Sequence, residues 1–128
     1  MAVKALSYIG VNSDKFEDWS IYSQKYLGMQ KIDRGKDILS FRMDDQKQRL
    51  TITGEKGDGL GFLGWEVENK EDLQIFATKL EKNKIVVHQG KSSFADKRFV
   101  EDLIYFDDPQ GNRIELVCNP MIDTDPFK

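Results

Sequence analysis

The sequence predicts an α+β fold in which a β-α-β-β-β unit occurs twice in tandem, its strands forming a curled mixed sheet with the helices outside. Three observations predict it. The order of strand-like and helix-like segments repeats, residues of the two copies match at a nearly constant offset, and strand side chains alternate between two faces. We expect one domain over residues 1–118 with pseudo-equivalent halves at about 1–54 and 60–118, then a tail or inter-domain connector over 119–128.

The first copy contains one strand, one helix and three further strands. A β-rich run over residues 4–11 precedes Ser13 and Asp14, which are typical helix N-caps. Large residues then recur every three to four positions, which predicts an amphipathic helix that ends at Leu27-Gly28. They are Phe16, Trp19, Tyr22 and Tyr26. Short strands are expected at about 29–33, 37–43 and 48–53.

The glycine-rich segment 54–59 is the expected linker, and Gly57 is a candidate hinge for exchange of halves between chains. The second copy begins with a strand over 60–67 and a helix over 70–82. The apolar face expected for that helix consists of Leu73, Ile75, Phe76 and Leu80. Further strands are expected at 85–87, 99–107 and 112–118, the last two joined by a turn over 108–112.

Matching positions support a duplication. An offset of 54 places Gly64 on Gly10, and the offset grows to 64 or 65 toward the ends of the copies. Pairs matched at the shorter offset include Tyr8 with Phe62, Ile9 with Leu63, Glu17 with Glu71, Asp18 with Asp72 and Ile21 with Ile75. Pairs matched at the longer offsets are Phe41 with Phe106, Arg49 with Arg113, Leu50 with Ile114 and Ile52 with Leu116.

Alternation along the strands divides their side chains between two faces. Apolar residues of one face should pack beneath the helices: Ile9, Val11, Leu50, Ile52, Leu63, Val67, Ile114 and Leu116. The other face carries Tyr8, Gly10, Arg49, Thr51, Phe62, Gly64, Arg113 and Glu115. If the halves share one curled sheet, this second face is a concave floor on which a ligand or metal would sit.

Composition excludes several classes of partner and location. With 19 basic and 22 acidic residues, a net charge of −3 and no basic stripe, the chain is not expected to bind nucleic acid or an anionic membrane. The single cysteine, Cys118, allows no intrachain disulfide, and no leader-like segment precedes the first strand. Apolar runs of about five residues are too short to span a membrane. We therefore expect a cytoplasmic protein.

Several phrases resemble one superfamily along the whole chain. They are Leu6-Ser7-Tyr8-Ile9-Gly10, Asp18-Trp19, Tyr26-Leu27-Gly28-Met29, Phe41-Arg42-Met43-Asp44-Asp45, Arg49-Leu50, Gly64-Trp65-Glu66, and the close Asp108-Pro109-Gln110-Gly111-Asn112-Arg113-Ile114-Glu115. The chain resembles the vicinal oxygen chelate superfamily, which includes glyoxalases, bleomycin-resistance proteins and extradiol dioxygenases. Within it, the chain is most similar to the N-terminal module of extradiol dioxygenases that cleave 2,3-dihydroxybiphenyl and related catechols.

The resemblance also implies where a metal would be held. Metal-bearing members take ligands from the first and last strands of each half, and ring-cleaving members use two His and one carboxylate on iron(II). The corresponding positions here are Tyr8, Thr51, Phe62 and Glu115, of which only Glu115 is a good ligand. We therefore assign no catalytic, cofactor-binding or metal residue, and interpret Tyr8, Phe62 and Glu115 as vestigial metal positions.

Three residues have a structural interpretation beside a functional one. Glu115 should pair with Arg113, which lies two residues away on the same strand face. His88, the only histidine, is expected to be exposed rather than catalytic. Cys118 is expected to behave as a small buried hydrophobe.

The function implied by the resemblance is a module without metal, inactive alone, at the N-terminus of an extradiol catechol dioxygenase. Its partner would be a C-terminal catalytic module holding iron(II), and the whole enzyme is expected to form a homo-oligomer. Residues 119–128 resemble the connector between the modules. Two alternatives remain: a free-standing, metal-free ligand-binding protein resembling bleomycin-resistance proteins, or a glyoxalase-like enzyme whose site is completed across a dimer.

Overall fold

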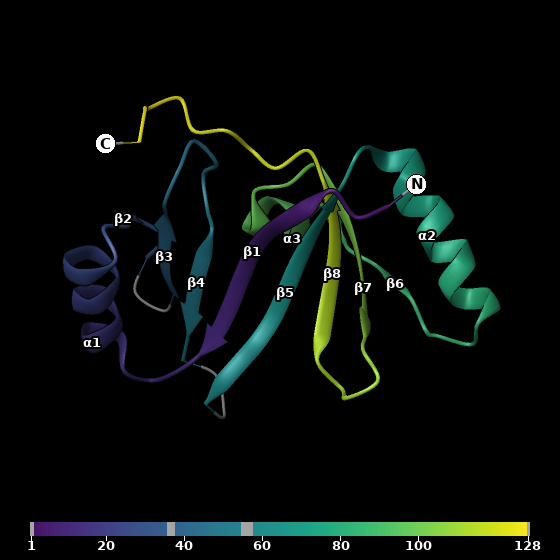
Figure 1. The fold of residues 1–128 in the computed structure, drawn as a ribbon, viewed down its shortest axis with the longest axis horizontal. Helices are drawn as coiled ribbons and strands as arrows, with labels where there is room; N and C mark the ends of the chain where they lie inside the picture. The colour runs from purple at the N-terminus through teal and green to yellow at the C-terminus, as the bar shows by residue number, and fades with distance from the viewer. Residues whose placement is uncertain (1, 36–37, 55–57, 128) are drawn as a thin grey trace. The chain divides into compact units, whose positions relative to one another are not determined.

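The computed structural model describes residues 2–35, 38–54 and 58–127 (Figure 1). The chain divides into two compact units. We call Tyr8–Gly61 with Ile122–Lys128 the α1 unit, and Met1–Ser7 with Phe62–Met121 the α2 unit, after the helix that each contains. The candidate hinge Gly57, the rest of the linker segment 55–57, and the expected strand start at residue 37 lie outside the described residues.

The α1 unit contains the first predicted copy. Its elements are β1 (Ala5–Asn12) from Tyr8 on, α1 (Phe16–Ile21), the π-helical segment η1 (Tyr22–Tyr26), β2 (Gln30–Ile32), β3 (Ile38–Arg42) and β4 (Leu50–Thr53). The strands lie in the order β2-β3-β4-β1. Strand β1 runs parallel to β4, whereas β2, β3 and β4 form antiparallel pairs, so the predicted mixed pairing is confirmed.

The α2 unit repeats this plan with one extra helix. Its elements are β5 (Gly59–Val67) from Phe62 on, α2 (Lys70–Lys82), β6 (His88–Gln89), α3 (Ser92–Arg98), β7 (Asp102–Asp107) and β8 (Arg113–Cys118). The strands lie in the order β5-β8-β7-β6, with β5 parallel to β8 and the other pairs antiparallel. The predicted strand over residues 85–87 was wrong, because pairing with β7 begins only at His88, and α3 was not predicted.

Backbone registers confirm the predicted duplication. Gly10 of β1 stands opposite Thr51 of β4, and Gly64 of β5 stands opposite Glu115 of β8. The neighbouring cross-strand pairs of the two units also correspond. The pairs are Ile9 with Leu50 and Leu63 with Ile114 between the parallel strands, and Phe41 with Leu50 and Phe106 with Ile114 between the antiparallel ones. The two copies therefore share one pairing pattern.

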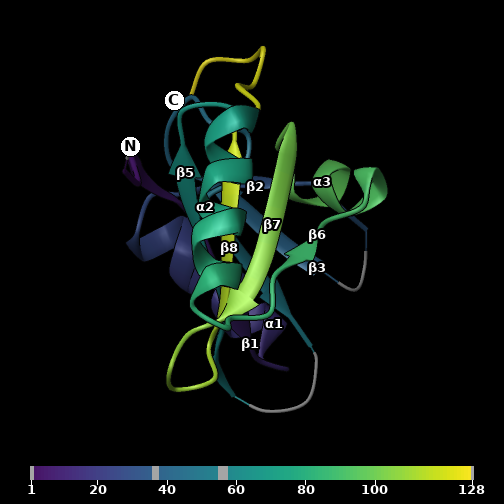
Figure 2. The same ribbon diagram turned by 90° about the vertical axis from the view of Figure 1, so that its right-hand side faces the viewer.

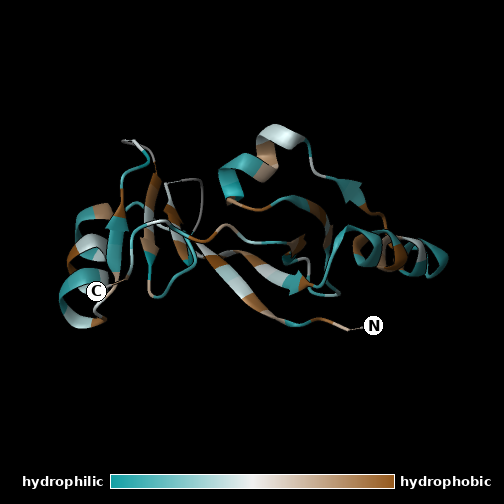
Figure 3. Ribbon diagram, turned by 90° about the horizontal axis from the view of Figure 1, so that it is seen from above, coloured by the Kyte–Doolittle hydropathy of each residue, from teal (hydrophilic) through white to brown (hydrophobic). Residues whose placement is uncertain are grey.

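Each unit has its own apolar core beneath its helix. In the α2 unit, α2 lies across β7 and β8 (Figure 2), and its buried Leu73 and Ala77 pack on Val67 and Leu116. Helix α2 carries both hydrophobic and hydrophilic residues around its circumference (Figure 3). In the α1 unit, Leu39, Phe41 and Ile52 are buried, with Val11, Phe16, Trp19, Met29 and Leu50 packed against them. Of the eight residues predicted to face the helices, five lie in these two cores: Val11, Leu50, Ile52, Val67 and Leu116.

Three local expectations about the helices were wrong. Ser13 and Asp14 do not cap α1, whose N-cap position is Lys15; the Ser13 hydroxyl instead accepts a hydrogen bond from the Lys15 N–H (3.2 Å). Tyr22 and Tyr26 are 52% and 66% exposed, because the small Ser23 is the residue that turns toward the strands. Ile75 is also exposed, since α2 presents Leu73, Phe76 and Ala77 to the core.

Candidate functional site

The four positions that the sequence predicts to correspond to metal ligands are all buried. Tyr8 and Thr51 belong to the α1 unit and are 2% and 1% exposed. Phe62 and Glu115 belong to the α2 unit and are 7% and 0% exposed. Within the α2 unit, Glu115 on the central strand β8 stands between Gly64 of β5 and Tyr105 of β7. The only carboxylate among the four positions is therefore fully withdrawn from water.

Two arginines hold the Glu115 carboxylate. Arg98 donates from Nε to Oε1 (2.9 Å) and from Nη2 to Oε2 (3.2 Å), a bidentate arrangement. Arg113 donates from Nε to Oε2 (3.0 Å), so the predicted pairing with Arg113 is confirmed. Arg98 was not predicted, because it lies on the unpredicted helix α3. Both arginines are shielded, their side chains being 14% and 32% exposed.

Aromatic rings pack against both guanidinium groups. The Cζ atom of Arg98 lies 3.9 Å from the ring centroid of Phe62 and 4.5 Å from that of Phe94. The Cζ atom of Arg113 lies 3.9 Å from the centroid of Tyr105 and 5.0 Å from that of Phe94. Cations over ring faces gain electrostatic stabilisation, more so when water is excluded. We call Phe62, Phe94, Arg98, Tyr105, Arg113 and Glu115 together the Glu115 cluster.

Helix α3 places Arg98 in this cluster. The helix ends at Arg98, and Phe99 follows in the left-handed conformation (φ 55°). The backbone N–H of Val100 then donates to the carbonyl of Ala95 (3.1 Å), which is buried in the α2 unit. This closing turn fixes the backbone from which the Arg98 side chain reaches Glu115.

The donors of the Glu115 cluster do not fit a divalent metal. Iron(II) of the ring-cleaving type needs two imidazoles and a carboxylate, whereas Phe62 offers no lone pair and Glu115 already accepts three hydrogen bonds from guanidinium groups. Across residues 2–35, 38–54 and 58–127, no three or more His, Cys, Asp or Glu side chains are grouped so that they could hold a metal. The geometry is that of a closed cluster in which two guanidinium groups surround one buried carboxylate.

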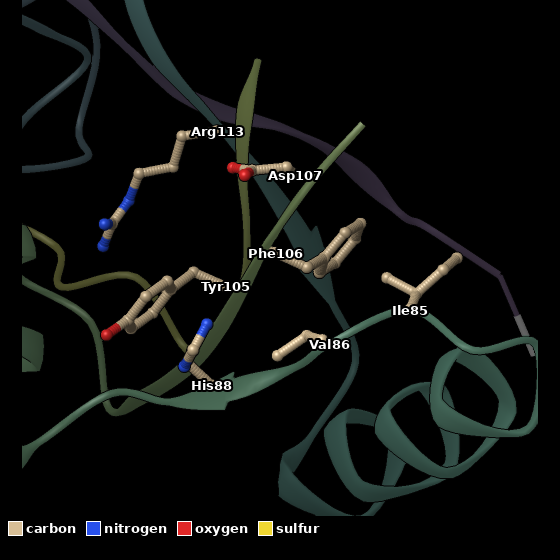
Figure 4. A pocket seen from close by; sticks show the side chains of 7 residues that line it. All are labelled: Ile85, Val86, His88, Tyr105, Phe106, Asp107 and Arg113. Atoms are coloured by element: carbon tan, nitrogen blue, oxygen red, sulfur yellow. The ribbon is translucent and has the colours of Figure 1, made fainter. Parts of the chain in front are cut away.

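A pocket of about 480 Å³ lies in the α2 unit beside the Glu115 cluster. Ile85, Val86 and His88 line it from the segment that runs alongside β7; the other lining residues are Tyr105, Phe106 and Asp107 of β7 and Arg113 of β8 (Figure 4). His88 is exposed, as predicted, and its ring stacks on Tyr105 with a centroid separation of 5.0 Å. The pocket thus combines three apolar side chains with a guanidinium, an imidazole, a phenol and a carboxylate.

Cys118 is a free, fully buried thiol, as predicted. Burial, with a smaller contribution from the nearby Glu101 carboxylate, raises the pKa of Cys118 to about 12. A thiol with that pKa carries almost no thiolate near neutral pH and is a poor nucleophile. The structure therefore supports the structural interpretation of Cys118.

The tail beyond residue 121 folds back onto the α1 unit. Asp123 Oδ2 lies 3.0 Å from Nη1 of Arg42, whose side chain is 1% exposed, and the Asp123 N–H donates to the carbonyl of Asp45 (2.8 Å). The pKa of Asp123 is lowered, mainly by the hydrogen bond it accepts from the Asp125 N–H and further by the charge of Arg42. Residues 122–127 are thus held by defined contacts.

Comparison with known proteins identifies relatives of this arrangement. Residues 6–54 match the family model described as Dihydroxybiphenyl dioxygenase BphC D1. The resemblance to extradiol dioxygenases is confirmed. A biphenyl-2,3-diol 1,2-dioxygenase of Sphingomonas paucimobilis is 30% identical over 125 residues, which is 97% of this chain and 42% of that dioxygenase. An iron-dependent extradiol dioxygenase of Rhodococcus jostii (strain RHA1) is 34% identical over 90% of this chain and 39% of its own length.

A crystal structure of catechol 2,3-dioxygenase matches the whole fold. It superposes with a TM-score of 0.95 at 30% identity, covering 100% of this chain and 46% of that dioxygenase chain. The chain thus spans about two fifths of the length of the curated extradiol dioxygenases that it matches. Among the helices in the part of the chain that the structure describes, none is long and apolar enough to cross a membrane.

Proposed function

We propose that this chain is the N-terminal, non-metal module of a ring-cleaving extradiol dioxygenase of aromatic-compound catabolism. The observation that carries the proposal is the Glu115 cluster. Its carboxylate stands at a position where metal-bearing members would place a ligand, yet two guanidinium groups use both of its oxygens. Such a core stabilises a fold without offering an open coordination position.

The catalytic work would belong to a C-terminal module that holds iron(II). Supporting this division, the matched relatives are more than twice as long as the aligned region, and one of them is described as iron-dependent. The present module would pack against the catalytic module, support assembly into a homo-oligomer and shape substrate access. The single, buried cysteine is compatible with the proposed cytoplasmic location.

The test compares two forms of the protein. The reading frame beyond Lys128 is sequenced, and the full natural product and residues 1–128 are each loaded anaerobically with iron(II) and assayed with 2,3-dihydroxybiphenyl and dioxygen. We expect a second module with His, His and Glu at positions equivalent to Tyr8, Phe62 and Glu115, and ring cleavage by the longer product alone. Cleavage by residues 1–128 with stoichiometric iron, or a stop codon directly after Lys128, would overturn the proposal.

The pocket beside His88 favours a second candidate, a metal-free binding protein for a small aromatic ligand. Its volume of about 480 Å³ lies in the usual range for ligand sites, and its polar side chains could orient a ligand that contacts the apolar ones. Calorimetric titration of residues 1–128 with 2,3-dihydroxybiphenyl tests it, with Val86→Ser as the variant that removes an apolar wall residue. Saturable binding that Val86→Ser weakens would favour this function; no heat of binding would exclude it for this ligand.

A further inference from the structure

We infer that the guanidinium of Arg98 occupies the point on which Phe62 and Glu115 converge, and that this built-in cation closes the position to divalent metals. The lack of an imidazole at position 62 is then a smaller obstacle to metal binding than the guanidinium of Arg98. The inference adds a mechanism to the proposed non-metal role and rests on that role only for its biological meaning, because metal binding by residues 1–128 can be measured by itself.

The first argument is geometric. The Phe62 ring centroid lies 3.9 Å from Cζ of Arg98, while the Glu115 oxygens lie 2.9 and 3.2 Å from two nitrogens of the same guanidinium. A ring on β5 and a carboxylate on β8 thus face one common cation. A histidine at position 62 in the same orientation would also present its ring face to this point, so its in-plane nitrogen lone pair would reach a metal there only after the ring turns.

The second argument concerns the oxygens of Glu115. Arg98 uses one lone pair on each oxygen, and Arg113 adds a third hydrogen bond on Oε2. A metal ion at the convergence point would have to displace the Arg98 guanidinium. That displacement would leave a cation without its carboxylate in a site from which water is largely excluded, which is strongly unfavourable.

The third argument is that Arg98 is held independently of the carboxylate. Phe94 covers the guanidinium from a second side, with its centroid 4.5 Å from Cζ, and the side chain is only 14% exposed. The left-handed turn at Phe99 ends the helix directly after Arg98 and fixes its backbone. A cation that is positioned in advance loses little conformational entropy when it pairs, which makes it a strong competitor for the site.

The test restores a ligand and removes the cation, separately and together. Four variants of residues 1–128 are prepared: Phe62→His, Arg98→Met, the double variant, and a matched control that combines Phe62→His with Lys97→Met. Lys97 is the exposed neighbour of Arg98 on α3, so its loss removes a charge without opening the cluster. Each is titrated with Co²⁺ alone, followed by visible absorbance and calorimetry.

We expect Phe62→His alone and the control to bind Co²⁺ weakly and indistinguishably, and the double variant Phe62→His with Arg98→Met to bind one equivalent at least tenfold more tightly. Equal affinity of Phe62→His and the double variant would overturn the inference. A folded double variant that binds no more tightly than the control would overturn it as well. Ring cleavage by the longer product is unaffected by either outcome, so failure of the inference and failure of the proposed function are distinguishable.

A measurement on the unaltered chain decides the matter if Arg98→Met does not fold. The Arg98 Nε–H proton should exchange slowly with solvent, and its NMR signal should stay sharp on addition of Co²⁺. Rapid exchange of that proton, or its selective broadening by Co²⁺, would overturn the inference. Arg98→Gln, which keeps a polar end without the charge, then replaces Arg98→Met in the titration.

Discussion

Thr51 and Glu115 occupy equivalent places in the two units, yet their chemistry differs. Each stands opposite a glycine on the neighbouring parallel strand, Gly10 for Thr51 and Gly64 for Glu115, and each is buried. Glu115 is a charge and is held by two arginines. The Thr51 hydroxyl makes no hydrogen bond within the described part of the chain. The duplicated backbone therefore places both side chains in the same environment of the sheet. A buried charge at that position requires cationic partners, whereas a buried hydroxyl does not.

The largest expected effect is the loss of Arg98. Arg98→Met leaves the buried Glu115 carboxylate with fewer cationic partners, and breaking one partner of a buried pair typically lowers the free energy of unfolding by roughly 3–5 kcal/mol. Because Arg113 remains, we expect about 3 kcal/mol, at the lower end of that range. Urea unfolding followed by circular dichroism measures it, with Lys97→Met as the control. If Arg98→Met lowers the free energy of unfolding no more than Lys97→Met does, the Glu115 cluster does not stabilise the fold.

Removal of the carboxylate charge should have a smaller effect. Glu115→Gln keeps an accepting oxygen and the side-chain volume, so we expect a loss of about 2 kcal/mol in the free energy of unfolding. Combined with Arg98→Met, the two losses should fall short of additivity by at least about 1 kcal/mol, since the two side chains act on each other directly. Additive losses in this cycle would show that the pair is not energetically coupled.

Acidification should weaken the α1 unit through Asp44 and Asp123, whose carboxyls are paired with arginines. The Arg49 side chain, as hydrogen-bond donor, lowers the pKa of Asp44, and the Asp125 N–H lowers the pKa of Asp123. A carboxyl whose pKa is lower in the folded state stabilises fully above its unfolded pKa of about 4 and loses that contribution as pH falls through the folded value. Unfolding measured from pH 6 to pH 2.5 should therefore show stability declining below about pH 4.

Asn substitutions at Asp44 and Asp123 give the matched comparison. The double variant should decline less steeply with acid than the unaltered chain, and amides of the tail at 122–127 should lose protection first in hydrogen exchange. The pKa of Asp108 in the α2 unit is also lowered, by the Asn112 N–H. An identical acid dependence in the variant and the unaltered chain would show that Asp44 and Asp123 contribute nothing to it.

The smallest effect is expected at Thr51. Thr51→Val replaces a buried hydroxyl that has no hydrogen-bond partner among the described residues by a methyl group of similar size. The free energy of unfolding should change by less than about 0.5 kcal/mol or rise slightly. A large loss of unfolding free energy in chemical denaturation would mean that the Thr51 hydroxyl is hydrogen-bonded to an ordered water. Thr51 would then, like Glu115, depend on a polar partner.

The sequence predicted those features that depend on local pattern. The repeated element order, the helix over 70–82 and the pairing of Glu115 with Arg113 follow from periodicity and from i, i+2 geometry along one strand. The structure confirms all three. Five of the eight predicted helix-facing strand residues follow from the same alternation.

What could not be predicted depends on contacts across the fold. Arg98 reaches Glu115 from 17 residues away, on a short helix over 92–98 in which only Phe94 and Ala95 are apolar. The one available signal was charge balance, because a buried carboxylate requires buried cations. The β-branched residues 85–87 predicted a strand, but β7 pairs with His88 and Gln89 instead. Val86 is 71% exposed. Tertiary pairing overrode local propensity there.

The most direct test of a module closed around Glu115 is the iron content of the unaltered chain. Residues 1–128 are dialysed anaerobically against iron(II) at increasing concentration, and bound iron is counted per folded chain. We predict that bound iron stays far below one equivalent and that the signals of Arg98, Arg113 and Glu115 in NMR spectra do not change. One saturable iron(II) per chain, with loss of the Arg98 contact to Glu115, would contradict the interpretation of Arg98 as the cation of this site.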